Sequence, residues 1–430
     1  MLESPSESFW NKSYEAATEL LQQRGIDIGE VVRKAAALEI ELPSWGMGRG
    51  GTRFGRYADG SEANTVPEKI ADCALVHELT GATPSVATHF PWDGADLRDA
   101  RQTLDAILGA GLRPGAVNSN TFSPRANGPM DHRMRFGSLT NPFEDVRRAS
   151  VEHNLECLEI MRMFGSRYLS VWLPDGTNSP GQLSLFDQAA WLDETLTEIY
   201  SKLRPNEIML IEYKFFEPGF YATAIPDWGR AYSIAEKLGP QAAVLVDLGH
   251  HAHGTNIEQV VAHLIHLRKF GGFHFNDRKY ADDDLATGSL DPAQLFRIFV
   301  VLLEADRRGL KPFSEVSLVI DQSHNIKNPM EEMIESVEAI QRAYVQALCV
   351  NYDRLDEARA VGDASAADQV LKNAFHGPAT DAVLWKSRVS RGLPADPMAA
   401  LRDGGHIERR RETRGDVPVV RQKSTGVLGG

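Results

Sequence analysis

Acidic and imidazole side chains gather in two short stretches of the sequence. LVDLGHHAHG, residues 245–254, places Asp247 at the end of an apolar run and three histidines within the next six residues. GGFHFNDRKYADDDL, residues 271–285, repeats the pattern with His274 and a run of three aspartates. Carboxylates and imidazoles bind divalent cations, and neither stretch contains a thiolate. The residue types therefore indicate a metal site, although either stretch alone is equally typical of a polar loop after a strand.

The elements that must position these groups are predicted from an alternation of short apolar runs with longer helical segments. The runs show little polar–apolar alternation, which is typical of strands buried on both faces. Eight strands are expected, over residues 38–45, 85–92, 113–120, 168–175, 208–214, 242–250, 271–277 and 317–324. Helices are expected over 66–80, 95–110, 143–165, 187–204, 229–238, 256–270 and 291–310. This alternation predicts an α/β fold, a closed (β/α)8 TIM barrel.

The barrel is predicted to occupy residues 36–330, between an N-terminal helical extension over 1–35 and a C-terminal helical extension over 331–430. The last ~20 residues are expected to be poorly ordered. The charged run RRRETR, residues 409–414, is interpreted as a solvated charge run. An open doubly wound sheet is the competing architecture, because GMGRGGTRFG, residues 46–55, contains a loose GxGxxG pattern. No clear helix follows it, so we interpret it as a flexible loop at the barrel mouth.

Composition excludes several classes of partner. The 46 Lys+Arg against 59 Asp+Glu give a formal charge of −13, which repels nucleic acid and anionic lipid. No stretch reaches the ~20 apolar residues of a membrane span, so we expect a soluble cytoplasmic protein. Cys73, Cys157 and Cys349 are far apart and form no CxxC pair, so we expect small core residues rather than disulfides or a thiolate zinc site.

The C-terminal ends of barrel strands supply the reactive groups in folds of this kind. Four successive predicted strands end on Glu212, Asp247, His274 and Asp321. Buried charges need compensation, and a divalent cation such as Mn²⁺, Mg²⁺ or Co²⁺ is the simplest source. Each residue alone could cap a helix, pair with a basic group or form an Asx turn. The coincidence on four consecutive strands favours a metal site.

A second cluster is available from His250, Asp282 and Asp284, with Glu212 or Asp247 as a bridge between two ions. Against it stands the fact that a triple aspartate is usually a solvated run. Aromatic side chains at the same end would suit the apolar face of a sugar: Trp45, Phe54, Trp92, Phe122 and Trp172. Polar groups that could orient hydroxyls are Asn118, Asn120 and Ser323.

Several motifs in one order resemble bacterial L-rhamnose isomerase, in the branch with a relaxed range of aldose substrates. They are PSWGMGRGGTRF, HFPWD, NSNTF, VEHNLECLEI, DLGHH, GGFHFNDRKYADDDL and IDQSHN. The resemblance covers the chain from about residue 10 to about residue 350. It implies a (β/α)8 barrel with extra C-terminal helices, a homotetramer, and two divalent ions per subunit. The ions are expected to be Mn²⁺, with Co²⁺ or Mg²⁺ as substitutes.

The resemblance also assigns residues to roles. The ligands of a structural ion are matched by Glu212, Asp247, His274 and Asp321, and those of a catalytic ion by His250, Asp282 and Asp284. The predicted substrate-binding residues are Trp45, Phe54, His89, Trp92, Phe122, Trp172, Lys214 and Ser323. Among these, Phe122 matches a position that reaches a neighbouring subunit's site. The predicted catalytic residues are Asp321, Lys214 and His89. One departure is that Glu212-Tyr213-Lys214 stands where related enzymes read Glu-His-Lys, which bears on substrate preference.

The predicted reaction is the reversible conversion of L-rhamnose to L-rhamnulose, and of related aldoses, by hydrogen transfer between C1 and C2. The hydrogen could move as a hydride or through an enediol. Because the candidate bases Asp321 and Glu212 are both expected as metal ligands, a hydride is favoured. A ketose 3-epimerase is the alternative, but it requires two facing glutamates and only Glu212 ends a strand. A non-catalytic sugar-binding barrel is the alternative from another class.

Overall fold

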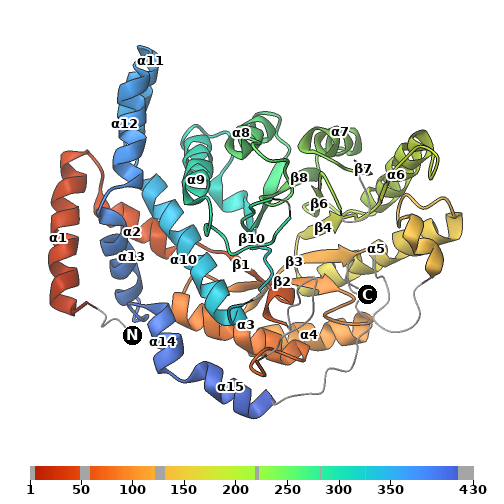
Figure 1. Cartoon of the computed structure of the whole chain (residues 1–430), viewed down its shortest axis with the longest axis horizontal. Coiled ribbons are helices and arrows are strands. Elements are labelled where there is room, and N and C mark those ends of the chain that lie inside the picture. The colour runs from red at the N-terminus through yellow and green to blue at the C-terminus, as the bar shows by residue number, and fades with distance from the viewer. Residues whose placement is uncertain are drawn as a thin grey trace.

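Eight parallel strands close into a barrel in the computed structural model, which describes residues 5–48, 59–121, 131–217, 222–280, 282–324 and 326–414 (Figure 1). The strands are β1 (Glu41–Pro43), β2 (Ser85–Phe90), β3 (Arg113–Asn120), β4 (Tyr168–Trp172), β6 (Ile208–Glu212), β8 (Ala242–Asp247), β9 (Phe270–Phe275) and β10 (Ser317–Ile320). Their order around the barrel is β1-β10-β9-β8-β6-β4-β3-β2. The predicted (β/α)8 barrel is confirmed, and the open sheet is excluded because β1 pairs with both β2 and β10.

A helix follows each strand and covers the outside of the barrel (Figure 1). These helices are α3 (Val66–Thr80), α4 (Leu97–Gly109), α5 (Glu144–Phe164), α6 (Leu185–Tyr200), α7 (Trp228–Leu238), α8 (Ile257–His266), α9 (Pro292–Arg307) and α10 (Pro329–Leu348). Local sequence fixes their starts: Thr65 and Glu68 form a capping box on α3, and Asp96 caps α4. No helix in the described ranges is long and apolar enough to cross a bilayer.

The register of the strands brings the predicted ligand positions to one end of the barrel. Asp247 on β8 pairs directly with His274 on β9. Glu212 on β6 pairs with Leu245, two residues before Asp247. Asp321 directly follows β10, and its backbone N–H donates to the carbonyl of Phe275 at 2.9 Å. Side chains from four adjacent strands therefore meet at the carboxyl ends of those strands.

The strand predicted over 113–120 is confirmed as β3, whereas the other seven strands are shorter than predicted, mostly at their carboxyl ends. The expected strand over 242–250 ends at Asp247, and the one over 317–324 ends at Ile320. The chain leaves the sheet where polar residues begin, because their side chains bond loop atoms instead of the ladder. A small two-stranded antiparallel sheet, which the sequence did not predict, pairs β5 (Gly176–Thr177), after β4, with β7 (Ala222–Thr223), after β6. The three cysteines are buried and unpaired, as expected.

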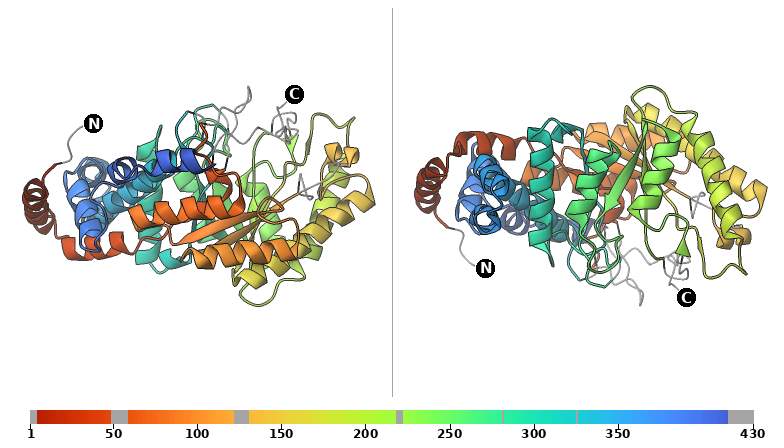
Figure 2. Two further views of the ribbon diagram at one scale, coloured as in Figure 1. Left: turned by 90° about the horizontal axis from the view of Figure 1, so that it is seen from below. Right: turned by 90° about the horizontal axis from the view of Figure 1, so that it is seen from above.

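Helices from the N-terminal and C-terminal parts of the described chain lie side by side at one end of the molecule (Figure 2). The helices before the barrel are α1 (Glu7–Gln23) and α2 (Ile28–Ala36), and both contact α13 (Ala379–Val389). Trp10 of α1 stacks on Trp385 of α13 with ring centroids 6.1 Å apart. A pair of helices, α11 (Tyr352–Ala360) and α12 (Ala364–Phe375), projects from the body as an arm (Figure 1). The division of the chain at residues 35 and 330 stays a prediction.

The interpretation of residues 409–414 as a solvated run is correct for Arg409 and residues 411–413, which are exposed, but wrong for Arg410 and Arg414. They lie in α15 (His406–Arg414), which follows α14 (Pro397–Asp403). The Asp72 side chain on α3 is only 3% exposed, and it accepts hydrogen bonds from Arg410 Nε at 2.5 Å and Arg414 Nη1 at 2.7 Å. A buried carboxylate requires such partners, so the run is held against the barrel. The rest of the tail, residues 415–430, lies outside the described residues.

Candidate metal centre

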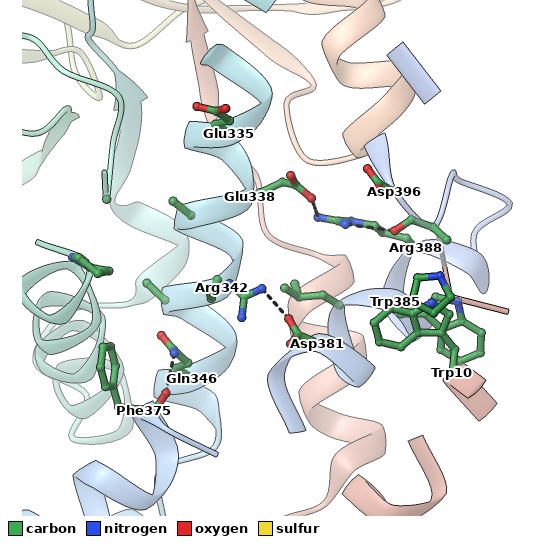
Figure 3. Close-up of a pocket in the computed structure, with 17 residues that line it drawn as sticks. Trp10, Glu335, Glu338, Arg342, Gln346, Phe375, Asp381, Trp385, Arg388 and Asp396 are labelled. Carbon is green, nitrogen blue, oxygen red and sulfur yellow. Dashed lines mark hydrogen bonds and ion pairs between the residues drawn. The ribbon is translucent and has the colours of Figure 1, made fainter. Parts of the chain in front are cut away.

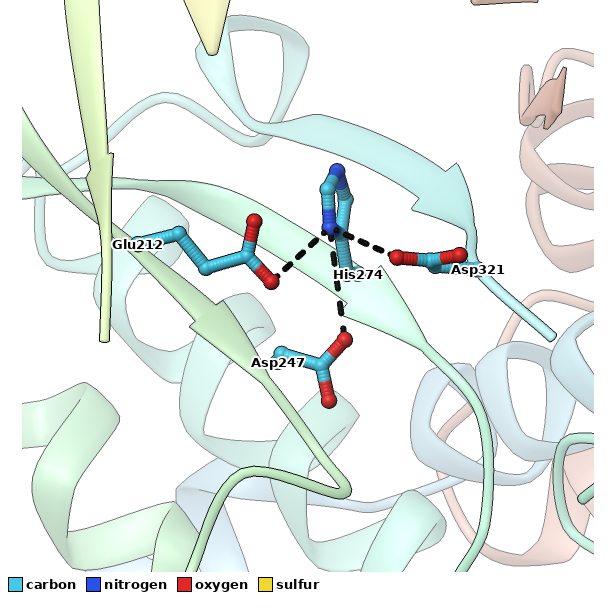
Figure 4. Close-up of side chains that lie close together, drawn as sticks. All are labelled: Glu212, Asp247, His274 and Asp321. Carbon is cyan, nitrogen blue, oxygen red and sulfur yellow. Dashed lines mark hydrogen bonds and ion pairs between the residues drawn. The ribbon is translucent and has the colours of Figure 1, made fainter. Parts of the chain in front are cut away.

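Four side chains converge on one point at the carboxyl end of the barrel. Glu212, Asp247, His274 and Asp321 each offer a ligand atom, and these atoms all lie within 4.8 Å of one another (Figure 4). His274 Nδ1 lies 3.3 Å from Glu212 Oε1 and 3.2 Å from Asp321 Oδ2. It lies 4.0 Å from Asp247 Oδ2. Three carboxylates around one imidazole form a donor set that fits a hard divalent cation.

Neighbouring groups fix the orientation of these carboxylates. Trp45, in the short helix η1 (Trp45–Met47), donates from Nε1 to Asp321 Oδ1 at 2.8 Å. Asn276 donates from Nδ2 to both oxygens of Asp247, at 2.9 and 3.1 Å, and the Gly249 N–H donates to Oδ1 at 2.7 Å. A Cβ at Gly249 would lie 2.9 Å from Asp282 Oδ1, so this close approach requires glycine. Such outer contacts hold ligands in place around a metal ion.

A second group of ligand atoms shares Asp247 with the first. Asp247, His250 and Asp282 also have ligand atoms within 4.8 Å of one another. His250 Nε2 lies 3.4 Å from Asp282 Oδ1 and 3.9 Å from Asp247 Oδ1, while its Nδ1 lies 3.0 Å from the carbonyl of Tyr213. An Nδ1–H bonded to that carbonyl leaves Nε2 free to bind a cation. Asp282 Oδ1 is buried without a well-formed hydrogen bond, which also fits an ion at this point.

Asp284 is part of the same cavity but lies outside both groups of convergent ligand atoms in the described residues. Its backbone φ is +46°, a conformation that few residues other than glycine adopt readily. The Ser323 N–H donates to the Asp284 carbonyl at 2.9 Å. Burial and the nearby charges of Asp282 and Asp321 raise the pKa of Asp284 well above its ordinary value. The sequence prediction of Asp284 as a ligand therefore stays a prediction.

The electrostatics of the two groups are those of a site that a cation would compensate. Burial raises the pKa of Asp247 to about 7, and the charge of His250 offsets this only in part. Burial lowers the pKa of an imidazole, but Asp247 and Asp282 hold that of His250 well above its ordinary value. Glu212 and Asp321 do the same for His274. Without a metal ion, bound protons must balance part of the negative charge of the buried carboxylates.

Apart from the fully buried Asp247, the members of the two groups line one cavity of about 260 Å³, which most of the predicted substrate-binding residues also line. Its lining includes Trp45, His89, Trp92, Asn118, Trp172, Lys214, Gln322 and Ser323. The His89 ring stacks on Trp92 with centroids 4.2 Å apart and meets Trp45 edge-on at 5.5 Å. Burial lowers the pKa of His89 to about 4, so the ring is neutral near pH 7. Its Nδ1 is buried without a hydrogen-bond partner among the described residues.

Other predicted residues lie elsewhere. Phe54 and Phe122 fall outside the described residues. Asn120 is fully buried and does not line the cavity. Sequence reasoning missed Glu217, which is 5% exposed and lies 2.6 Å from Lys214 Nζ through its Oε2. The available signal was an acidic residue three positions after Lys214 in EYKFFE.

A larger cavity, of about 660 Å³, lies between α1, α10, α12 and α13 (Figure 3). Its two arginines pair with carboxylates: Arg342 lies 2.5 Å from Asp381, and Arg388 lies 2.9 Å from Glu338. Trp10 and Trp385 form its aromatic wall. None of the residues that line it belongs to a group of convergent metal-ligand atoms within the described ranges.

Known proteins similar to this chain include sugar isomerases. No family model matches it. The chain is 43% identical over 401 residues to a probable sugar isomerase of Rhizobium meliloti strain 1021, covering 93% of this chain and 91% of that protein. It is 40% identical over 417 residues to a probable sugar isomerase of Mesorhizobium japonicum, covering 97% and 95%. The chain therefore belongs to the family of these probable sugar isomerases.

Two solved structures share the fold of this chain. The structure of an L-ribulose 3-epimerase matches with a TM-score of 0.52 and 14% identity, covering 75% of this chain and 98% of that one. A D-allulose 3-epimerase from Methylomonas sp. matches with a TM-score of 0.50 and 13% identity, covering 71% and 98%. At these identities the likeness shows the TIM-barrel architecture alone.

Proposed function

We propose that this member of the sugar isomerase family is a two-metal aldose–ketose isomerase of the L-rhamnose isomerase type. It would interconvert L-rhamnose and L-rhamnulose, together with related aldoses. The observation that carries the proposal is the pair of ligand groups that share Asp247 and whose other members line one aromatic cavity. Two neighbouring cations would suit a substrate with oxygen atoms on adjacent carbons. Family membership supports the reaction class, and the sequence motifs support the substrate.

Two ions have a defined set of ligands in this proposal. The first would be held by Glu212, Asp247, His274 and Asp321, and the second by Asp247, His250 and Asp282. When bound, the ions would polarise the C1 carbonyl and lower the pKa of the C2 hydroxyl. We propose Mn²⁺ as the ion, with Co²⁺ or Mg²⁺ as substitutes that the same oxygen-rich ligands would accept.

The cavity walls would orient an open-chain sugar. The rings of Trp45, Trp92 and Trp172 offer apolar faces for its C–H groups, and Ser323 offers a hydroxyl. Neutral His89 offers a ring nitrogen to a sugar hydroxyl. The Lys214 ammonium offers hydrogen bonds to sugar oxygens, because Asp282 and Glu217 outweigh the effect of burial and raise its pKa above the ordinary value. These contacts would hold C1 and C2 in place and exclude water.

The hydrogen would move from C2 to C1 as a hydride, while the O2 proton is transferred to O1. The two carboxylates that could act as bases, Glu212 and Asp321, are both metal ligands in this proposal. Neither is therefore free to remove a proton from carbon. Turnover in D₂O tests the route. We expect almost no deuterium at C1 of the product, and substantial deuterium there would refute the hydride proposal.

The function is tested by an aldose panel with metal-stripped protein, reloaded with Mn²⁺, Co²⁺ or Mg²⁺ in turn. We expect no turnover without metal, two ions bound per chain, and conversion of L-rhamnose to L-rhamnulose with Mn²⁺. Product analysis by NMR separates C1–C2 isomerisation from epimerisation at C3. A protein that binds no divalent ion, or that only epimerises ketoses at C3, would refute the proposal.

The 3-epimerase alternative needs acid–base groups on both faces of one carbon. In the described part of the chain, Glu212 is the one glutamate in either ligand group, and Glu217 is bound to Lys214. The non-catalytic alternative would appear in the same panel as tight sugar binding without turnover. The assembly proposed from the motifs is a homotetramer, with a solution mass near four times the 47.5 kDa of one chain. Light scattering measures that mass directly.

A further inference from the structure

Glu217 is a buried carboxylate next to the second ligand group, although it neither belongs to that group nor lines the cavity. It follows β6 by five residues and lies 2.6 Å from Lys214 Nζ. The Lys214 backbone is fixed independently, because its N–H donates to the Ile225 carbonyl at 3.0 Å and its carbonyl accepts from the Thr223 hydroxyl. The contact with Glu217 therefore orients only the side chain of Lys214, because other hydrogen bonds already hold its backbone.

Lys214 joins Glu217 to the second ligand group. Its ammonium also lies 2.6 Å from Asp282 Oδ2, and 5.3 Å above the ring of Trp172. An ammonium has three N–H donors, so two bonds to carboxylates leave one for the cavity that Lys214 lines. The side chains of all three charged residues are largely buried, at 8% exposed for Lys214, 6% for Glu217 and 14% for Asp282. Their interactions are therefore only weakly screened by water.

Asp282 has two oxygens with different neighbours. Oδ2 faces Lys214, whereas Oδ1 lies 3.4 Å from His250 Nε2, inside the second ligand group. A buried ammonium balanced by Asp282 alone would draw that carboxylate away from a cation, because both charges compete for one partner. Glu217 supplies a second negative charge to the same ammonium. The charge of Lys214 is thus shared between Glu217, which belongs to neither ligand group, and Asp282, whose other oxygen faces His250.

We infer that Glu217 is a positioning residue for the second ion and for the sugar. It shares the charge of Lys214 so that Asp282 Oδ1 stays available to a cation, and it holds the ammonium so that the third N–H meets a sugar oxygen. This inference rests on the proposed two-metal function. It adds a residue that acts through Lys214 and touches neither ion nor substrate.

The test is a Glu217→Gln variant, which keeps the shape of the side chain and removes its charge. Mn²⁺ titration of the metal-stripped protein by calorimetry reads the two sites separately from activity. We expect the second ion to bind ~10-fold more weakly, as is typical when an outer partner of a ligand is removed, and the first ion to bind as before. We also expect KM for the aldose to rise more than kcat falls, since the lost charge acts on substrate binding.

The matched control is Glu207→Gln. Glu207 directly precedes β6, at the opposite end from Glu217, and its carboxylate lies 2.8 Å from Arg162 Nε. The change removes a similar shielded charge pair, so it should lower stability and leave both Mn²⁺ affinities unchanged. Equal Mn²⁺ titrations for wild type and Glu217→Gln would overturn the inference, as would equal losses in both variants.

A double variant separates a specific role from general damage. If Glu217 acts only through Lys214, adding Glu217→Gln to Lys214→Met should change the second-ion affinity no further. Additive losses would overturn the inference. If Glu217→Gln does not fold, Glu217→Asp, which keeps the charge on a shorter side chain, should retain more than half of the second-ion affinity. Wild-type protein that binds two ions and isomerises the aldose keeps the proposed function intact, whatever the variants show.

Discussion

The barrel mouth and the helical cavity of Figure 3 differ in how their charged side chains are compensated. In the helical cavity Arg342 pairs with Asp381 and Arg388 with Glu338, so each of these charges has a partner of opposite sign. At the barrel mouth Glu212, Asp247, Asp282, Asp284 and Asp321 lie around two imidazoles and Lys214. These five carboxylates outnumber the one ammonium group, that of Lys214. The excess of negative charge, held in place by outer hydrogen bonds, is what a divalent ion would neutralise.

The two cavities also show that the volume of a cavity does not indicate its chemistry. The helical cavity is the larger, at about 660 Å³ against about 260 Å³. It has an aromatic pair, and its two arginines pair with Asp381 and Glu338, although Arg388 Nε is buried without a hydrogen-bond partner among the described residues. At the barrel mouth the buried atoms without such a partner include Asp282 Oδ1 and His89 Nδ1, which belong to the second ligand group and to the cavity wall.

The largest effect is expected from Asp247→Asn, because Asp247 belongs to both ligand groups. The amide keeps an acceptor for the Gly249 N–H but removes the charge that two cations would share. Loss of metal catalysis costs several kcal/mol, so kcat/KM should fall by roughly 10³-fold or more. Elemental analysis should find less than one ion per chain. Asp381→Asn in the helical cavity is the matched control, and a comparable loss of activity there would contradict the contrast between the two regions.

A smaller effect is expected from His250→Ala, because His250 belongs only to the second ligand group and touches the first only through a 3.1 Å contact of its Nδ1 with Glu212 Oε1. We expect the bound ions to fall from two per chain to one, and kcat to fall by about 10²-fold because one of the two Lewis acids is lost. Calorimetric titration with Mn²⁺ measures the stoichiometry. Retention of two tightly bound ions would remove His250 from the ligand set and with it the support for a second site.

The strand ends that bear Glu212, Asp247 and His274 could be predicted from sequence, because Glu212 and Asp247 directly end apolar runs and His274 is the next-to-last residue of another. Such a position fixes both the element and the face of the barrel. Asp321 follows β10 for the same reason. This part of the site depends only on local patterns and on the closure of the barrel.

The loops beyond the strands could not be predicted in the same way. Asp282, Asp283 and Asp284 are three consecutive identical residues, so the sequence alone does not distinguish their roles. Only the path of the backbone does. Asp283 accepts from the N–H groups of Lys279 and Tyr280, whereas Asp282 faces His250. Distant contacts decide that path. The pairing of Glu217 with Lys214 depends in the same way on the loop that follows β6.

A modest effect is expected from Trp45→Phe at the barrel mouth. The change removes the 2.8 Å hydrogen bond from Nε1 to Asp321 Oδ1 and keeps an aromatic ring in the cavity. A hydrogen bond to a charged group contributes about 1.5 kcal/mol, so the first ion should bind ~10-fold more weakly. Trp385→Phe is the control in the helical cavity and should leave Mn²⁺ affinity unchanged. Equal affinities for wild type and Trp45→Phe would show that Asp321 needs no such support.

The smallest effect is expected from Arg342→Ala in the helical cavity. The side chains of Arg342 and Asp381 are 48% and 55% exposed, so water screens the pair, and its loss should lower the free energy of unfolding by at most about 1 kcal/mol. Urea denaturation measures that change, and kcat/KM should stay within twofold of wild type. The helix α10 follows the strand that positions Asp321, so the helical cavity is connected to the barrel mouth through the chain. A fall in activity without a matching fall in stability would show that the two regions are coupled. Paired charges alone would then not mark a region as structural.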